Sequence, residues 1–169
     1  MRESVRGWFL DTVTLANFAL SGSFHLVQER YGRSLLVTEP VRTELAEGRA
    51  RGYTQLEAVE SALAAGEIAP AGPMTAVESE LFAQLLQSLG SGEASCIAFA
   101  RYRNGVVATD DRAARSVCSN YGVPVTGTIG ILTALCRGGA LSAQAADAAL
   151  SRIVETGFYS PVRRISDLL

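Results

Sequence analysis

Aspartates directly follow two short apolar runs of the sequence. Asp11 comes after Trp8–Leu10, and Asp110 and Asp111 come after Val106–Ala108 with one threonine between. Asp forms strands poorly and is costly to bury without a partner, so neither position helps the strand that precedes it. In an open parallel sheet, ligand sites form at the carboxyl ends of the strands. We therefore expect these aspartates to share one edge of a sheet.

Two glutamates are expected near the same edge. Glu44 lies one turn after Pro40, and Glu93 lies in the first turn of a helix that Ser91 can cap. Like charges gathered in one crevice repel each other, and a cation among them offsets that repulsion. Ligation by oxygen atoms alone suits Mg²⁺ or Mn²⁺, and such an ion lowers the pKa of a bound water.

Each acid also has an ordinary structural interpretation. Asp11 can cap the helix that follows it, and so can the pair Asp110 and Asp111. Glu93 can interact with a helix dipole, and Glu44 can be an exposed helix position. The joint placement of these acids at expected strand and helix ends favours a shared metal site over the separate explanations.

The basic residues narrow the possible chemistry. All 15 are Arg, none is Lys, and His25 is the one histidine. A chain without Lys has no P-loop phosphate site, no Schiff base and no kinase-type ATP clamp. Catalysis by a pair of histidines is excluded as well. A metal ion held by carboxylates can activate a water molecule without Lys or His.

Short apolar runs alternate with helical patterns, which predicts a single α/β domain over residues 1–169 with a central parallel sheet. Strands are expected at 8–10, 35–37, 68–69, 106–108 and 123–125. Helices are expected at 12–20, 24–31, 40–47, 55–65, 76–89, 93–103, 112–120, 128–136 and 142–154. The helix at 76–89 is expected to bury Val77, Leu81, Leu85, Leu86 and Leu89. The tail at 159–169 is expected as a short amphipathic helix or as a flexible or partner-contacting end.

Four segments resemble one family. They are FLDTVTLANFALSG (9–22), VTEPVRTELAEG (37–48), LGSGEASCIAFARYRNGVVATDDRAAR (89–115) and YGVPVTGTIGILTAL (121–135). In this order and spacing they resemble the PIN-domain family, and most closely its VapC-like branch with GEA and DDRAAR motifs. The resemblance is strongest over residues 8–140, and residues 141–169 form a helical C-terminal extension.

The resemblance implies a three-layer α/β fold whose central parallel sheet has about 4–5 strands. It also implies an acidic pocket that holds Mg²⁺ or Mn²⁺ and a metal-dependent endonuclease activity, usually on RNA. Many such proteins are toxins of type II toxin–antitoxin pairs, are neutralised by a small antitoxin protein, and form homodimers.

The resemblance assigns roles to individual residues. The catalytic and metal-binding acids would be Asp11, Glu44, Glu93, Asp110 and Asp111, and either of the last two could be the direct ligand. Three polar residues would orient those acids: Thr12, Asn17 and Thr109. Position 93 is often Asp in the family, so Glu93 lengthens one ligand by a methylene.

The resemblance also frames a mechanism. One or two Mg²⁺ or Mn²⁺ ions among the acids would activate a water for in-line attack on an RNA phosphate. Arg112 and Arg115 share a helix face and could hold flanking phosphates, and Arg101 and Arg103 could extend that path. Alternatively, these arginines are solvated at the surface or form ion pairs with nearby glutamates. The net charge of −2 indicates a local basic patch rather than a broad basic face.

Other residues favour ordinary roles. Cys96, Cys118 and Cys136 lie in apolar segments without metal-ligand spacing, which is typical of buried thiols in a reducing cytoplasm. The N-terminal residues lack a signal-like apolar stretch, and no apolar run is long enough for a membrane span. Tyr102 and Tyr121 are weak candidates for base stacking.

Two alternatives remain open at this stage. A nucleic-acid-binding module could keep this fold and the acids without nuclease activity. A metal-dependent phosphatase could use a strand-end aspartate as nucleophile, but that chemistry typically uses Asp-x-Asp and a later Lys, and Asp11-Thr12-Val13 provides neither.

Overall fold

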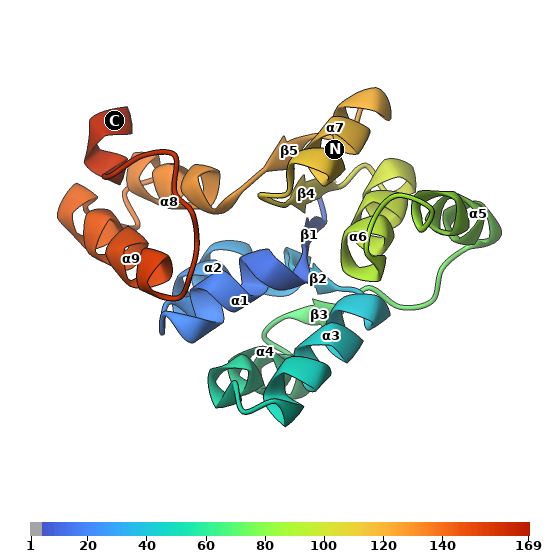
Figure 1. Ribbon diagram of the computed structural model, residues 1–169, viewed down its shortest axis with the longest axis horizontal. Helices are drawn as coiled ribbons and strands as arrows, with labels where there is room; N and C mark the ends of the chain where they lie inside the picture. Colours follow the sequence, from blue (N-terminus) through green and yellow to red (C-terminus); the bar gives the residue numbers. More distant parts are fainter. Residues whose placement is uncertain (1–4) are drawn as a thin grey trace.

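In the computed structural model, which describes residues 5–169, short parallel strands lie at the centre of the molecule. β1 (Trp8–Leu10) pairs with β4 (Val106–Ala108), and β4 pairs with β5 (Val125–Thr126). β2 (Leu36–Val37) pairs with β3 (Ala69–Pro70), and a bridge between Trp8 and Leu35 joins this pair to β1. The order across both groups is β3-β2-β1-β4-β5, so the predicted central parallel sheet is confirmed (Figure 1).

Helices connect and cover these strands. They are α1 (Thr12–Leu20), α2 (Phe24–Tyr31), α3 (Glu39–Ala50), α4 (Glu57–Ala64), α5 (Ala76–Leu85), α6 (Ser91–Tyr102), α7 (Arg112–Asn120), α8 (Thr128–Arg137) and α9 (Ala143–Glu155). Single 3₁₀ turns cover Gly32–Ser34, Thr54–Leu56 and Ile165–Leu168. The predicted α/β class is confirmed, and most boundaries lie within a few residues of the expected ones.

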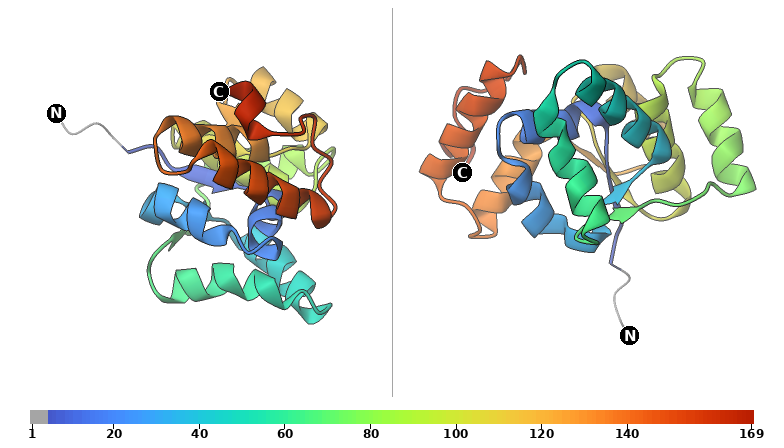
Figure 2. Two further views of the ribbon diagram at one scale, coloured as in Figure 1. Left: turned by 90° about the vertical axis from the view of Figure 1, so that its left-hand side faces the viewer. Right: turned by 90° about the horizontal axis from the view of Figure 1, so that it is seen from below.

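The helices form two layers around the strands. α6 packs on β1 and β4, and α5 packs outside α6. On the other side lie α1, α8 and α9, as Figures 1 and 2 show. The rings of Phe9 on β1 and Phe99 on α6 stack with centroids 5.7 Å apart at the centre of the core. This packing holds the last turn of α6 against β1, and the Cys96 thiol in the middle of α6 donates to Leu10 O at the end of β1.

The prediction for the helix at 76–89 is partly wrong. α5 ends at Leu85, and residues 86–89 form a turn and bend. Because α5 packs mainly on α6, it buries only a narrow stripe that contains Leu81 and Leu85. Val77 and Leu86 are 49% and 44% exposed, so neither belongs to the core.

The C-terminal tail packs on the domain. It contains a single 3₁₀ turn, at Ile165–Leu168, in place of an amphipathic helix. Ile165 is fully buried, and Ser166 donates to Asp147 on α9 through its backbone N–H at 3.0 Å and its hydroxyl at 2.7 Å. These contacts hold the tail against α8 and α9. Within the described residues 5–169, no helix has the length and apolar character of a membrane span.

Candidate active site

Asp11 lies buried where β1 ends and α1 begins. Its Oδ1 accepts a hydrogen bond from Thr14 N at 2.8 Å, so the predicted helix cap is confirmed. Its Oδ2 accepts from the Thr109 hydroxyl at 2.5 Å. Burial raises the pKa of Asp11, the bonds from Thr109 and Thr14 oppose that rise, and the charge of Asp110 adds to it. The carboxylate is therefore held in one orientation by groups from two elements.

Asp110 and Asp111 follow β4, beside Asp11. Asp110 accepts from Thr128 N at 3.0 Å and from the Thr128 hydroxyl at 2.6 Å, at the positive N-terminus of α8. Asp111 is exposed, and its Oδ1 caps α7 by accepting from Ala114 N at 2.8 Å. Both oxygens of Asp110 thus accept hydrogen bonds within the protein, whereas Asp111 accepts through Oδ1.

Glu93 lies in the first turn of α6, half-buried. Burial raises the pKa of Glu93, and the charges of Asp11, Asp111 and Glu44 raise it further. Negative charges from four different elements therefore act on one another at this place.

Glu44 reaches the same region from α3. Its Oε1 accepts from the Ser91 hydroxyl at 2.9 Å and from Gly92 N at 2.8 Å. The prediction that Ser91 caps α6 is wrong, because Gly90 occupies the cap position and the Ser91 hydroxyl donates to Glu44 instead. Glu44 thus satisfies a free backbone N–H at the start of the helix that carries Glu93.

A cleft of about 360 Å³ joins four of the five predicted acids. It is lined by Asp11, Val13, Glu93, Asp110, Asp111, Phe158 and Tyr159. Glu44 does not line this cleft. It lines a neighbouring groove of about 520 Å³ between α3, α5 and α6, whose walls include Met74, Phe82 and Phe99.

The three predicted orienting residues lie around these acids. Thr109 donates to Asp11, and Asn17 donates through Nδ2 to the Thr128 hydroxyl at 3.2 Å, which in turn donates to Asp110. The buried Thr12 Oγ1 has no hydrogen-bond partner among the described residues. A Cβ atom added at Gly92 would lie 3.0 Å from this hydroxyl and 2.9 Å from Glu44 Oε1, so both border one small space.

The chemistry of these side chains fits a hard divalent cation. All are oxygen donors, and the buried Thr12 hydroxyl adds one that the protein leaves unpaired. In the described part of the chain, no three His, Cys, Asp or Glu side chains come together closely enough to hold a metal by themselves. Four of the carboxylates, those of Asp11, Glu44, Asp110 and Asp111, instead accept hydrogen bonds from hydroxyl or backbone amide groups. Mg²⁺ typically takes one or two carboxylates together with waters, so this open arrangement suits it better than a closed cage would.

The predicted phosphate-binding arginines differ in their surroundings. Arg112 and Arg115 are both exposed on α7. The Arg115 Nη1 donates to Thr109 O at 2.9 Å and to Thr126 O at 3.0 Å, which fixes its guanidinium at the ends of β4 and β5.

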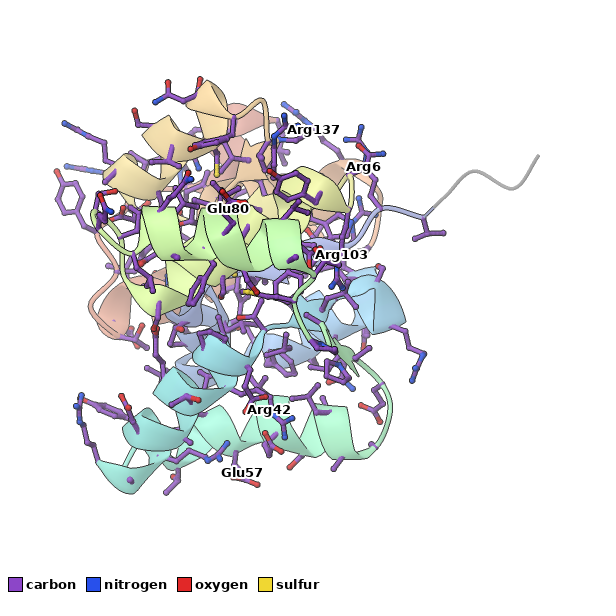
Figure 3. The ribbon with its side chains drawn as sticks, turned by 90° about the vertical axis from the view of Figure 1, so that its right-hand side faces the viewer. Arg6, Arg42, Glu57, Glu80, Arg103 and Arg137 are labelled. Carbon is purple, nitrogen blue, oxygen red and sulfur yellow. The ribbon has the colours of Figure 1, made fainter. Side chains whose placement is uncertain are left out.

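Arg103 forms an ion pair with a glutamate, one of the alternatives that the sequence left open for these arginines. It forms a two-pronged pair with the buried Glu78, at 2.7 and 3.1 Å, and donates to Ala71 O and Pro73 O at 2.7 and 3.1 Å. Figure 3 shows Arg103 beside the N-terminal end of α5, the end that connects to β3. Its fork is occupied, so the expectation that it extends a phosphate path is wrong.

Sequence reasoning missed Phe158 and Tyr159. Both line the acidic cleft although they lie in the C-terminal extension, far from the motifs in sequence. Their segment has no helical or strand periodicity, and the sequence offers no signal there beyond two adjacent aromatic residues. Tyr102 and Tyr121, the expected candidates for stacking, do not line this cleft.

Comparison with known proteins identifies the family. A family model, DUF3368, described as a PIN domain, matches residues 8–169, a span that includes the helical residues after 140. No curated protein and no solved structure matches the chain. The resemblance to PIN domains is thereby confirmed, whereas the VapC-like branch stays a prediction. The chain belongs to the PIN-domain family, whose members are generally nucleases.

Proposed function

We propose that this chain is a Mg²⁺- or Mn²⁺-dependent endoribonuclease. The observation that carries the proposal is the cleft where Asp11, Glu93, Asp110 and Asp111 meet at the carboxyl ends of parallel strands. These acids would hold the ion, with Glu44 and the Thr12 hydroxyl beside them. When bound, the ion supplies positive charge at the phosphate and lowers the pKa of the attacking water.

The protein's own residues position the acids. Thr109 and Thr14 orient Asp11, and Thr128 orients Asp110. Such hydrogen bonds hold a carboxylate in the geometry that an ion requires. The chain contains no Lys, and its one histidine, His25, is exposed on α2 and does not line the cleft. Activation of water is therefore assigned to the carboxylate site.

Cleavage of end-labelled RNA in the presence of Mn²⁺ tests the proposal. Asp11→Asn is the informative variant, because Asn can still cap α1 while the negative charge is removed. Internal fragments from the wild type and their loss in Asp11→Asn support the proposal. Equal cleavage by both proteins contradicts it. RNA binding without cleavage would favour a binding module, and phosphate release from a simple phosphomonoester would favour a phosphatase.

We further propose that the nuclease is the toxin of a type II toxin–antitoxin pair. Support comes from the groove of about 520 Å³, where apolar side chains lie between Glu39, Glu44 and Glu47, next to the acidic cleft. A partner segment with apolar and arginine side chains complements such a groove. Expression of the chain alone should slow bacterial growth, Asp11→Asn should not, and the product of a neighbouring reading frame should restore growth.

We also propose that the protein is a cytoplasmic homodimer. Cys96, Cys118 and Cys136 are all free thiols, as expected in a reducing compartment. The exposed Val77 on α5 and Leu86 directly after α5 offer apolar surface for self-association. Analytical ultracentrifugation of the wild type and of Leu86→Glu tests the dimer, and identical monomeric behaviour of both would contradict it.

A further inference from the structure

The segment that carries Phe158 and Tyr159 is anchored on both sides. Before it, α9 ends with Gly157 N donating to Val154 O at 3.0 Å. After it, Ile165 is fully buried and Ser166 donates twice to Asp147. Tyr159 is nevertheless 90% exposed, the most exposed large hydrophobic side chain in the described residues. The chain thus holds the segment of Tyr159 against the domain while the ring itself is exposed to solvent.

That position is the boundary between two clefts. Tyr159, Phe158 and Asp110 line the acidic cleft, and the same three residues line a second cleft of about 400 Å³. The remaining walls of the second cleft are Arg115, Val125, Thr126, Gly127, Ile129, Gly130 and Pro161. A ligand in the second cleft therefore lies directly beside the candidate active site.

The second cleft contains a positively charged side chain beside an apolar wall. Arg115 is fixed by Thr109 O and Thr126 O through Nη1, so its guanidinium enters the cleft as an oriented positive charge. Ile129 offers an apolar surface, and Gly130 leaves its part of the wall without a side chain. A cleft of this size is within the roughly 300–1,000 Å³ that small ligands occupy. A planar base attached to a phosphate matches these groups.

We propose that Tyr159 stacks on an unpaired RNA base in this second cleft while Arg115 contacts the phosphate of the same nucleotide. The base belongs to the nucleotide next to the bond cut in the acidic cleft, so the inference rests on the proposed nuclease function. Aromatic stacking accepts any base but needs that base to be unpaired, so the position is tested with a single-stranded RNA. Tyr159 is then a positioning residue outside the acid cluster.

The test measures binding of a short fluorescent single-stranded RNA by anisotropy, in an Asp11→Asn background that prevents cleavage. Tyr159→Ala should weaken binding by roughly 5- to 150-fold, the usual contribution of one stacked base. Tyr159→Phe should bind like the parent, because the ring remains. The matched control is Tyr53→Ala, which removes another exposed tyrosine (53%) that lines neither cleft and should leave binding unchanged.

A second measurement identifies the base itself. A single abasic position is moved through the RNA, and the position that costs most affinity in the parent should cost nothing more in Tyr159→Ala. Unchanged binding by Tyr159→Ala, or equal losses at that position in both proteins, overturns the stacking role. If the otherwise wild-type enzyme still cleaves RNA, the proposed function survives that result. Failure of the wild type to bind or cleave any RNA overturns both.

Discussion

The Thr109 hydroxyl donates to Asp11 Oδ2 at 2.5 Å, and this bond joins the carboxyl ends of the neighbouring parallel strands β4 and β1. Both residues are buried, and Asp11 also caps α1 through its other oxygen. One hydrogen bond therefore connects the sheet, a helix start and the acid that faces the cleft. The orientation of Asp11 therefore depends on Thr109, after the neighbouring strand, as well as on Thr14 N of its own helix.

Replacing Thr109 tests this dependence. Thr109→Val keeps the branched shape but removes the donor, so the pKa of Asp11 should rise further above its ordinary range. We expect cleavage to fall roughly 10- to 100-fold, as for other residues that orient a metal ligand. Folding should lose about 1–3 kcal/mol for the unpaired carboxylate oxygen. Thr109→Ser, which keeps the hydroxyl, is the control, and wild-type cleavage rates in Thr109→Val would contradict the role.

Two variants at Asp111 distinguish its role as a helix cap from its role in catalysis. Asp111→Asn can still accept from Ala114 N, so its melting temperature should match the wild type while cleavage falls because the charge is gone. Asp111→Ala should lose the same activity and also about 1 kcal/mol of stability with the cap. Thermal unfolding together with initial cleavage rates measures both effects. Full activity in Asp111→Asn would leave Asp110 as the direct ligand.

Gly92 leaves room for Glu44. A Cβ atom at this position would lie 2.9 and 3.0 Å from the two carboxylate oxygens of Glu44. Gly92→Ala should therefore displace Glu44 and lower cleavage, although Ala favours a helix by about 1 kcal/mol over Gly. Gly48→Ala is the matched control, because its Cβ meets only the end of the Leu56 side chain. Cleavage that falls equally in both variants would contradict a specific role for Gly92.

The pair between Arg103 and Glu78 should dominate local stability. Glu78 is 1% exposed, so Arg103→Met leaves a buried carboxylate without its partner. Breaking a buried pair in this way costs about 3–5 kcal/mol, and the partial exposure of Arg103 favours the lower end. Urea unfolding measures the loss. A change below about 1 kcal/mol would place the pair among ordinary surface ion pairs.

The same pair predicts an acid-sensitive fold. Burial tends to raise the pKa of Glu78, but the bonds from Arg103 and Thr75 outweigh it and lower that pKa overall. The stability from this lowered pKa is present above about pH 4.3, the usual value for Glu, and is lost as the pH falls further. Urea unfolding between neutral pH and pH 3 should therefore show a steeper decline in the wild type than in Glu78→Gln. Parallel declines in the two proteins would contradict this assignment.

The sequence predicted the elements whose signals are local. Asp11 after an apolar run and a helix from Thr12 to Leu20 were both visible because capping and periodicity depend on neighbours in the chain. Ser91 was misread as a cap because its hydroxyl has a distant partner, Glu44, on another helix. Similarly, the exposure of Val77 depends on which elements pack against α5, and the apolar pattern of that helix alone does not show this.

In the candidate site, too, residues with local sequence signals could be predicted, whereas residues placed by distant contacts could not. Asp11, Asp110 and Asp111 could be found from their type and from the strand ends they follow, because parallel strands bring those ends to one edge. Glu44 and Glu93 could be found from their places near expected helix starts. Tyr159 could not be found in this way, since its place at the cleft depends on how the tail packs through Ile165 and Ser166. Glu78 could not be identified as the partner of Arg103 either, because the two residues lie far apart in the sequence and meet only through the packing of α5 on α6.

The central claim is that the acids of the cleft form one metal-dependent catalytic site. It is tested most directly by the initial rate of RNA cleavage at increasing Mn²⁺ concentration for the wild type and for Glu93→Gln. Glu93→Gln retains the size of the side chain while removing its charge next to Asp11 and Asp111. We predict saturable activation by Mn²⁺ in the wild type and a rate at least roughly 100-fold lower in Glu93→Gln at every concentration. Cleavage that does not depend on Mn²⁺, or that is equal in the two proteins, would contradict the account.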